Sequence, residues 1–309
     1  MHAALPIAPS EIPNQALRTL HPKGTSCGAP GQMGQPTLGI WILLTGTNVF
    51  EAMLLDMDGV LYHGDRPLPG AAEFLCAIQQ IPHVFITNNP VLPPQAVADK
   101  LACLGLPRPH ARQIITSAQA TACWLAQQKP DFRYYAVGAD GLDQALRQVG
   151  KADRENADYV VVGEGPGIDF DVLTTGINLI VRQGARLVGT NPDNSVDGDR
   201  NGEHYLLPGG GALVAPFAVA SGVEPVIIGK PNPILYEMAL ELIGCRAENC
   251  LMIGDRPDTD IAGAVALGMQ TALVRTGRFG PGESWPEGLP RPGWDVSSLS
   301  ELRECLGMQ

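Results

Sequence analysis

The sequence predicts an α/β protein built on a doubly wound parallel sheet. Its 309 residues, of which 45% are hydrophobic, are enough for about two domains with a sizeable core. From Glu51 onward, short apolar runs alternate with amphipathic helical stretches. Strands that alternate with helices form parallel sheets, and such sheets bind ligands beyond the carboxyl ends of their strands.

The apolar runs are expected to be buried strands because each is short and almost free of charge. They cover residues 52–55, 83–86, 134–137, 159–162, 226–228, 250–253 and 271–274. Between the second and third runs, Val97, Leu101 and Leu104 recur at helical spacing and predict a helix that ends before Gly105.

Two further helices are predicted from their starting residues. Asn232 and the proline after it provide a start for a helix over residues 234–243. Thr259 or Asp258 is expected to cap a helix over residues 261–267.

Composition excludes several classes of protein. The formal charge of −11 argues against a nucleic-acid partner bound by bulk attraction. No run approaches the roughly 18 apolar residues of a membrane span, so no membrane partner is expected. Seven cysteines without a C-x-x-C pair support neither a disulfide framework nor a zinc site, and they favour a cytoplasmic location.

Residues 1–48 differ from the rest of the chain. They are rich in Pro, Gly, Ser and Thr and show no sustained period of 2 or 3.6. We interpret them as a disordered N-terminal extension, and a wrongly chosen translation start is the competing explanation. No functional prediction depends on them.

Two pairs of aspartates directly follow predicted strands. Asp56 and Asp58 come after the first strand, and Asp255 and Asp260 come after the sixth. Alone, the first pair is equally consistent with a turn, and the second with acids at a helix N-terminus. Together, carboxylates that converge on one sheet edge would repel one another unless a hard dication held them. The sequence therefore predicts Mg²⁺, which takes oxygen ligands and keeps phosphate oxygens in its shell.

Two other polar stretches also follow predicted strands. Thr87, Asn88 and Asn89 offer a hydroxyl, two amides and backbone N–H groups that can hold an anion, although an ordinary polar turn has the same composition. Lys230 follows the strand at residues 226–228. It is either solvated surface or, beside several carboxylates, a phosphate ligand.

These four stretches stand in the order of the four motifs of the haloacid dehalogenase (HAD) superfamily, which the chain resembles from about Phe50 to Gly277. They are DMDGV (56–60), TNN (87–89), GKP (229–231) and GDRPDTD (254–260). The similarity is greatest to subgroup IIA, the NagD-like and 4-nitrophenyl-phosphate phosphatases. Four motifs in order, each after a strand, are much more specific than one.

The resemblance also implies a domain organisation. The stretch between Thr87 and Lys230 is far longer than one βα unit needs. Relatives fill this gap with an inserted α/β cap domain of the C2 type, which interrupts a Rossmann-like core. GTNPD (189–193) and PGGGAL (208–213) resemble parts of that cap. We expect the HAD-like core at residues 49–128 and 214–309, and the cap at residues 129–213.

By resemblance, each acid has a role. Asp56 is implied to attack phosphorus and form an aspartyl-phosphate, and an aspartate is ionised at neutral pH as this requires. Asp58 resembles the general acid and base, so its pKa should be raised by burial and acidic neighbours. Mg²⁺ is implied to bind Asp56, the backbone carbonyl of Asp58, and Asp255, with Asp260 nearby.

The residues implied to hold phosphate are Thr87, Asn88, Asn89 and Lys230. One departure from the family pattern follows them, because Pro90-Val91-Leu92 stands where relatives often have hydroxyl or basic residues. This departure bears on the capping of the next helix and on any additional phosphate contact there.

One further stretch has the beginning of a calcium loop. Asp193, Ser195 and Asp197 have the spacing, but the twelfth position is His204 instead of Glu. We interpret it as a polar cap loop that faces substrate, and we expect residues 190–204 to help set specificity.

The predicted function is a Mg²⁺-dependent phosphatase for small phosphorylated metabolites, of the sugar-phosphate, phosphoglycolate or 4-nitrophenyl-phosphate type. A dehalogenase is disfavoured because Asp58 supplies an acid and base that such enzymes typically lack. A phosphomutase is disfavoured because the stretch between Asp58 and Thr87 is too short to hold a cap domain. The alternative is a non-catalytic phosphometabolite-binding or regulatory protein on the same fold. The resemblance is compatible with a homodimer formed through the cap.

Overall fold

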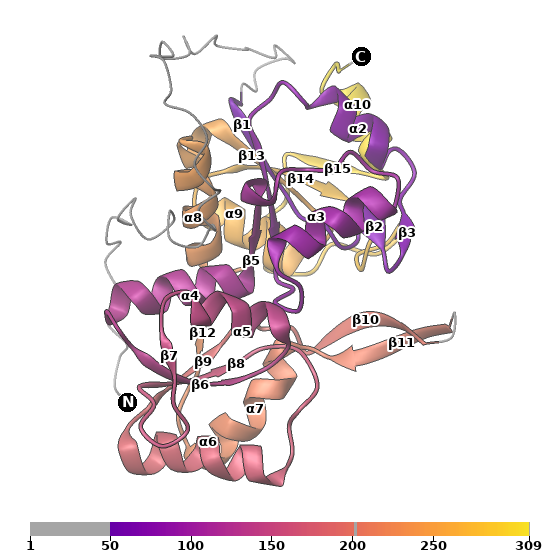
Figure 1. The fold of residues 1–309 in the computed structure, drawn as a ribbon. Helices are drawn as coiled ribbons and strands as arrows, with labels where there is room; N and C mark the ends of the chain where they lie inside the picture. Colours follow the sequence, from indigo (N-terminus) through magenta and orange to yellow (C-terminus); the bar gives the residue numbers. More distant parts are fainter. Residues whose placement is uncertain (1–49, 201–202, 309) are drawn as a thin grey trace, which may run out of the picture.

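The structure, a computed structural model, describes residues 50–200 and 203–308. The N-terminal extension predicted at residues 1–48 lies outside these residues. Two parallel sheets organise the described chain, one in each half of the molecule (Figure 1). The predicted α/β class with a Rossmann-like parallel core is confirmed.

The first sheet has six parallel strands in the order β15-β14-β13-β1-β4-β5. Its strands are β1 (Ala52–Leu55), β4 (His83–Thr87), β5 (Ile114–Thr116), β13 (Cys250–Gly254), β14 (Gln270–Val274) and β15 (Trp294–Val296). In β1, Met53 and Leu55 belong to one apolar cluster and Ala52 and Leu54 to another. Alternate residues of a strand point to opposite faces, so both faces of this sheet are buried.

Helices cover the two faces of the first sheet. One face packs against helices α2 (Ala71–Ala77), α3 (Pro94–Cys103) and α10 (Leu299–Cys305). The other packs against helices α4 (Ser117–Gln128), α8 (Pro233–Ile243) and α9 (Ala262–Ala266). Short elements complete this half: β2 (Tyr62–His63), β3 (Arg66–Pro67), the 3₁₀ turns η1 (Ala111–Gln113) and η2 (Ala247–Asn249), and the π-helical turn η3 (Pro257–Ile261).

The second sheet has five parallel strands in the order β12-β9-β8-β6-β7. They are β6 (Arg133–Val137), β7 (Lys151–Ala152), β8 (Tyr159–Val162), β9 (Arg186–Gly189) and β12 (Val226–Ile227). The helices of this half are α5 (Asp140–Arg147), α6 (Phe170–Gln183) and α7 (Gly210–Ser221). Helices α4 and α5 pack together at the junction between the two sheets (Figure 1).

The position of β12 differs from the predicted cap boundary at residue 213. Val226 and Ile227 pair with Val188 and Gly189 of β9, so β12 extends the second sheet. Helix α7 packs on β9 and on α6, so it also belongs to this half. The chain therefore returns to the first sheet only after β12, because the main-chain pairing with β9 makes β12 an edge strand of the second sheet.

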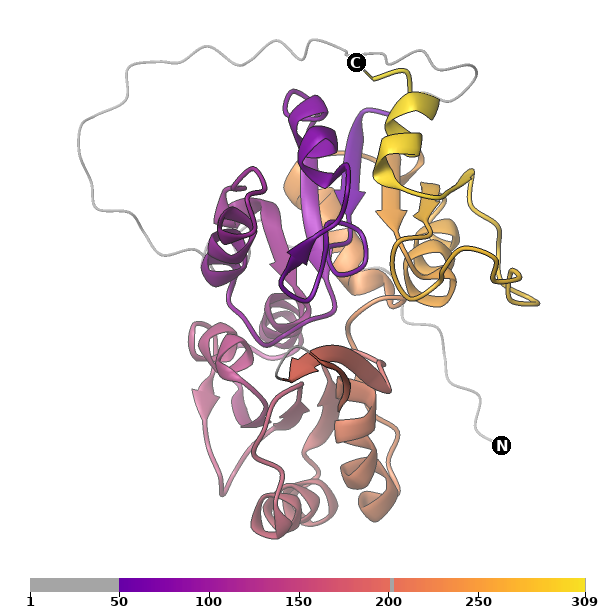
Figure 2. The same ribbon diagram turned by 90° about the vertical axis from the view of Figure 1, so that its right-hand side faces the viewer.

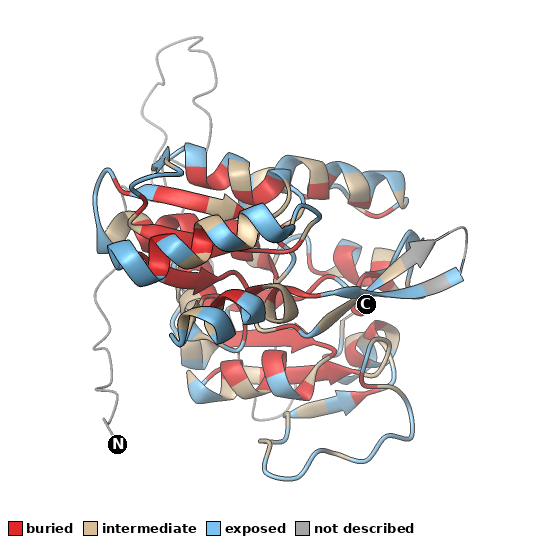
Figure 3. Ribbon diagram, turned by 90° about the horizontal axis from the view of Figure 1, so that it is seen from below, coloured by how far each residue is buried: buried red, intermediate tan, exposed pale blue. Residues whose placement is uncertain are grey.

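A two-stranded hairpin leaves the second half of the molecule. Its antiparallel strands are β10 (Ser195–Arg200) and β11 (Glu203–Pro208). In Figures 1 and 2 the hairpin lies at the level of the junction between the sheets. Figure 3 shows β11 mostly exposed, whereas the central strands of both large sheets, such as β1, β13 and β8, are buried.

The predicted elements are largely confirmed. All seven predicted strands are present within one residue of their predicted bounds. Helix α3 ends before Gly105 as expected, and α8 starts and ends as expected. The predicted helix over residues 261–267 is present within one residue of its bounds, as α9 (Ala262–Ala266). Its predicted cap at Asp258 or Thr259 is wrong, because both residues lie inside a π-helical turn at Pro257–Ile261 that begins after Arg256.

Among the described residues, every helix is too short or too polar to cross a bilayer.

Candidate active site

The predicted site residues meet at the carboxyl ends of the strands. Asp56 follows β1, Thr87 ends β4, and Asp255 follows β13. Lys230 joins them from the segment after β12, and Asp260 from the turn η3. A cavity of about 620 Å³ opens here, and residues from both halves of the molecule line it. Side chains from distant parts of the sequence therefore share one cleft.

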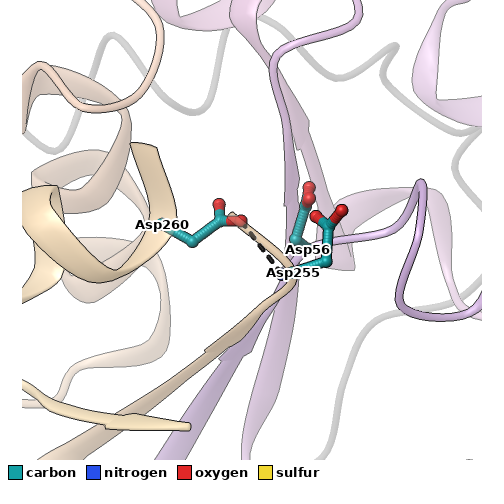
Figure 4. Close-up of side chains that lie close together, drawn as sticks. All are labelled: Asp56, Asp255 and Asp260. Carbon is teal, nitrogen blue, oxygen red and sulfur yellow. Dashed lines mark hydrogen bonds between the residues drawn. The ribbon is translucent and has the colours of Figure 1, made fainter. Parts of the chain in front are cut away.

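Asp56, Asp255 and Asp260 form a compact cluster of carboxylates. One oxygen from each lies within 4.8 Å of the others, and all three side chains are buried. In Figure 4 the carboxylates of Asp56 and Asp255 lie side by side, and Asp260 approaches from the other side. Three buried oxygen ligands at this separation fit a hard divalent cation such as Mg²⁺.

The electrostatics of the cluster also fit a cation. Burial raises the pKa of Asp56 to about 7, while the charge of Lys230 acts in the opposite direction. Burial, and then the charges of Asp260 and Asp56, raise the pKa of Asp255 well above its ordinary value. Carboxylates held this close need more positive charge than one lysine supplies if all of them are to be ionised.

Lys230 lies between two acids of the cluster, Asp56 and Asp260. Its Nζ is 2.7 Å from Oδ1 of Asp56 and 2.7 Å from Oδ1 of Asp260, and the residue is only 2% exposed. Burial by itself lowers the pKa of Lys230, but the charges of Asp260 and Asp56 outweigh it and raise the pKa. The ammonium is therefore charged and is held beside Asp56.

Asp260 has its oxygens engaged by the protein. Oδ1 accepts from Lys230, and Oδ2 accepts from the backbone N–H groups of Asp255 at 3.2 Å and Arg256 at 3.0 Å (Figure 4). These bonds fix both Lys230 and the loop that carries Asp255. Asp260 thus positions the site, in addition to any contribution it makes to a cation.

The Asp255 carboxylate fits into a space that glycines leave open. Its Oδ2 accepts from the backbone N–H of Arg278 at 2.8 Å. A Cβ at Gly59 would lie 2.5 Å from that oxygen, and one at Gly277 would lie 1.9 Å from it. Gly59 has a φ of +81°, which also favours glycine.

Asp58 borders the open cavity, and the Tyr62 hydroxyl donates to its Oδ2 at 3.1 Å. Desolvation within the walls of the cleft raises the pKa of Asp58, against the opposing charge of Lys100 and the bond from Tyr62. The direction is the one expected of a carboxyl group that begins as an acid. Its side chain is not part of the three-carboxylate cluster.

The polar residues at the end of β4 and just after it have different roles. Thr87 is buried at the cavity, and its hydroxyl accepts from the backbone N–H of Asn89 at 3.1 Å. The Asn88 amide instead holds the backbone of Lys230, with Oδ1 accepting from N at 2.7 Å and Nδ2 donating to O at 3.0 Å. Asn88 therefore positions Lys230, and its side chain is less available to phosphate than predicted.

The departure at Pro90 affects the next segment as expected. Helix α3 starts after Pro93 without a side-chain cap. The carbonyl of Val91 accepts from the backbone N–H of Gly141 at 2.9 Å, at the start of α5. A Cβ at Gly141 would lie 2.4 Å from the carbonyl oxygen of Pro90, so the two segments touch closely.

Residues of the second half close over the site. Asn191 and Asp193 lie in the stretch 190–204 that was predicted to face substrate, whereas Glu164 was not predicted as a site residue. Asn191 donates from Nδ2 to the carbonyl of Asn88 and to Oε1 of Glu164, both at 2.8 Å. Asp193 pairs with Arg256 and accepts from Asn88 Nδ2 at 3.1 Å. The available signal was the position of Glu164 and Asn191, each two residues after a strand, β8 and β9 respectively.

Two family models match the chain. "Haloacid dehalogenase-like hydrolase" matches residues 53–152, and a second HAD-hydrolase model matches residues 227–302. The chain is 37% identical over 255 residues to "5'-nucleotidase YutF" of Bacillus subtilis, covering 82% of this chain and 97% of the relative. It belongs to the haloacid dehalogenase-like hydrolases.

Other relatives of this HAD hydrolase agree. "Acid sugar phosphatase" of Staphylococcus saprophyticus is 37% identical over 257 residues, covering 82% of this chain and 96% of the relative. Among solved structures, NagD from E. coli K-12 has 32% identity and a TM-score of 0.72, covering 82% and 98%. The p-nitrophenyl phosphatase from Archaeoglobus fulgidus has 27% identity and a TM-score of 0.73, with the same coverage.

These findings confirm the predicted NagD-like subgroup and the predicted enzyme class, a phosphoric monoester hydrolase, at the level of the family.

Proposed function

We propose that this HAD hydrolase is a Mg²⁺-dependent phosphatase that hydrolyses small-molecule phosphate monoesters through an aspartyl-phosphate on Asp56. The observation that carries the proposal is the buried cluster of Asp56, Asp255 and Asp260, in which Lys230 pairs with Asp56 and Asp260, and from which Asp56, Asp255 and Lys230 line one cavity. The phosphatase names of the relatives support the same reaction class.

Asp56 is the proposed nucleophile. Its Oδ1 is held at 2.7 Å by Lys230, which leaves the second oxygen of the carboxylate for attack. The Lys230 ammonium also favours the ionised, nucleophilic form of Asp56. Attack of that oxygen forms the Asp56–phosphorus bond and breaks the bond from phosphorus to the leaving oxygen.

Asp58 is the proposed general acid and base. It lies two residues from Asp56 and borders the same cavity, and its pKa is raised. It donates its proton to the leaving oxygen and then takes a proton from the water that hydrolyses the aspartyl-phosphate. Tyr62 holds the carboxyl group in place through its hydroxyl.

Mg²⁺ is the proposed cofactor, with Asp56, Asp255 and the backbone carbonyl of Asp58 as its protein ligands. When bound, it neutralises charge on the phosphoryl oxygens. Thr87 and Lys230 are proposed to bind the phosphoryl oxygens directly, since both border the cavity beside Asp56. Asn89 stays a predicted phosphate contact.

Turnover of 4-nitrophenyl phosphate by the purified full chain, with and without Mg²⁺, tests this proposal. We expect release of 4-nitrophenol that depends on Mg²⁺ and stops when a chelator is added. A folded wild-type protein that binds phosphate but releases no product would instead favour the non-catalytic binding protein.

The Asp56→Asn variant tests the assigned nucleophile. We expect loss of turnover by at least a thousandfold with an unchanged circular dichroism spectrum, because an amide oxygen is a much weaker nucleophile than a carboxylate. Asp99→Asn is a matched control, since Asp99 pairs with Arg108 on an exposed surface away from the cavity. Near-normal activity of Asp56→Asn would exclude Asp56 as the nucleophile.

A cytoplasmic location and a homodimer formed through the cap are further proposals. The first is supported by the six cysteines of the described chain, which are all free thiols. Size-exclusion chromatography with light scattering tests the second.

A further inference from the structure

We propose that Glu164 makes this enzyme selective for phosphate esters whose leaving group is uncharged and hydroxylated, and selective against esters whose leaving group carries a carboxylate or another phosphate. This inference rests on the proposed phosphatase function and concerns its substrate class. Glu164 comes from the second half of the molecule, two residues after the end of β8.

Glu164 faces the part of the cavity that receives the leaving group. It lines the same cavity as Asp58, and the two carboxyl groups interact electrostatically. Asp58 is the proposed proton donor to the leaving oxygen, so the leaving group extends from Asp58 toward the wall that Glu164 helps to form. A charge on that wall therefore acts on the leaving group as well as on the transferred phosphoryl group.

The Glu164 carboxylate is held in place by neutral donors. Oε1 accepts from Nδ2 of Asn191 at 2.8 Å, and the carboxylate also accepts from the backbone N–H of Gly210, the first residue of α7. The residue is 4% exposed. Asn191 is itself bound to the carbonyl of Asn88, so Glu164 cannot swing away without breaking bonds across the cleft.

The other acids of this wall have basic partners. Asp193 pairs with Arg256, and Asp197 pairs with Arg278 at 2.9 Å. Glu164 makes no ion pair with any residue whose side chain the structure describes. Both arginines that line the cavity are thus held by carboxylates, and Glu164 leaves this wall with a net negative charge.

That charge depends on pH within the assay range. The pKa of Glu164 is raised to about 7, mainly by burial and also by the charges of Asp193 and Asp58. The hydrogen bond from Asn191 lowers the pKa and offsets part of this rise. At pH 8 most of the carboxylate is ionised, so it repels an anionic leaving group and accepts hydrogen bonds from hydroxyl groups.

Two esters of nearly equal size test the proposal. They are 2-hydroxyethyl phosphate and 2-phosphoglycolate, which differ by a hydroxymethyl group in place of a carboxylate. We expect wild type to prefer the hydroxyethyl ester in kcat/KM at pH 8. Glu164→Gln should reduce that preference about tenfold, equivalent to about 1.4 kcal/mol, while Glu164→Asp should keep most of it.

Asp169→Asn is the matched control, because Asp169 is an exposed acid five residues away whose oxygen caps α6 through Val172, a bond that asparagine also makes. It should leave the preference unchanged. An unchanged preference in Glu164→Gln, or an equal change in Asp169→Asn, would overturn the inference.

The pH profile separates a charge effect from a structural one. The wild-type preference should fall between pH 8 and pH 6 as Glu164 takes up a proton, and it should stay flat in Glu164→Gln. If Glu164→Gln does not fold, a constant wild-type preference over this range still refutes the inference. Normal turnover of 4-nitrophenyl phosphate with no such selectivity refutes this inference alone, whereas absence of all turnover refutes the proposed function as well.

Discussion

Gly277 offers a sharp test of the proposed metal site because it packs directly against the Asp255 carboxylate. A Cβ built on Gly277 would lie 1.9 Å from Oδ2 of Asp255, 2.5 Å from its Cγ and 2.8 Å from its Cβ. Ordinary contact begins near 3.4 Å, so the Asp255 carboxylate has to move well away from its position in Gly277→Ala. Such a move also strains the bond from the backbone N–H of Arg278.

Mg²⁺ accepts oxygen ligands only at about 2.0–2.1 Å, so this displacement removes Asp255 as a ligand. We expect the Mg²⁺ concentration for half-maximal turnover of 4-nitrophenyl phosphate to rise by about 10–100-fold, the range found when partners of metal ligands are lost. The overpacking itself should cost about 1–3 kcal/mol of the free energy of unfolding.

Gly280→Ala is the control for Gly277→Ala. It lies three residues away, and its Cβ would meet only the flexible end of Glu283, at 3.3 Å. Rates at a series of Mg²⁺ concentrations, together with urea unfolding, measure both effects. A folded Gly277→Ala protein whose half-saturating Mg²⁺ concentration lies within twofold of wild type would refute the assignment of Asp255 as a ligand.

Three other substitutions have defined outcomes. Asp58→Asn should lower kcat for alkyl phosphates by about 10²–10⁴-fold. The loss should be smaller for 4-nitrophenyl phosphate, because its leaving group needs less protonation, and an equal loss for both substrates would contradict the acid role. The pKa of Glu164 is about 7 in the folded protein and 4.5 unfolded, so its stabilisation is complete below pH 4.5 and is lost as pH rises to 7. Relative to Glu164→Gln, wild type should therefore lose up to about 3 kcal/mol in urea unfolding between pH 4.5 and 8, and parallel pH curves would refute this. Lys230→Met leaves Asp56 and Asp260 without their cationic partner. The free energy of unfolding measured without metal should fall by about 3–5 kcal/mol, and an unchanged urea midpoint would show that these ion pairs contribute little.

Sequence reasoning succeeded where a local pattern has one stable structural solution. A short apolar run such as residues 250–253 buries both of its faces only inside a parallel sheet, and β13 forms there. Asn232 followed by proline has a cap and a fixed φ, and α8 begins at that point. The acids and Lys230 were found for a related reason, because polar groups directly after buried strands collect at one sheet edge.

The errors arose where long-range pairing decides between local alternatives. The run at residues 226–228 was recognised as a strand, but only its pairing with β9 assigns it to the second sheet. The π-helical turn η3 occupies the place where Asp258 or Thr259 was predicted to cap the next helix. Its geometry places Asp260 against Lys230 and against the N–H groups of Asp255 and Arg256, contacts that no local propensity encodes.

The sequence by itself determined the family, the alternation of strands and helices, and the acids and the lysine that meet in the cleft, because these follow from short-range pattern and motif order. Only the tertiary structure decided how the second half of the molecule closes over them. The bonds from Asn191 to Asn88 and Glu164, and the pairing of Asp193 with Arg256, join segments that are distant in the sequence. Contacts of this kind depend on how two separately formed sheets dock, which is set by the shape of their packed surfaces and not by neighbouring residues.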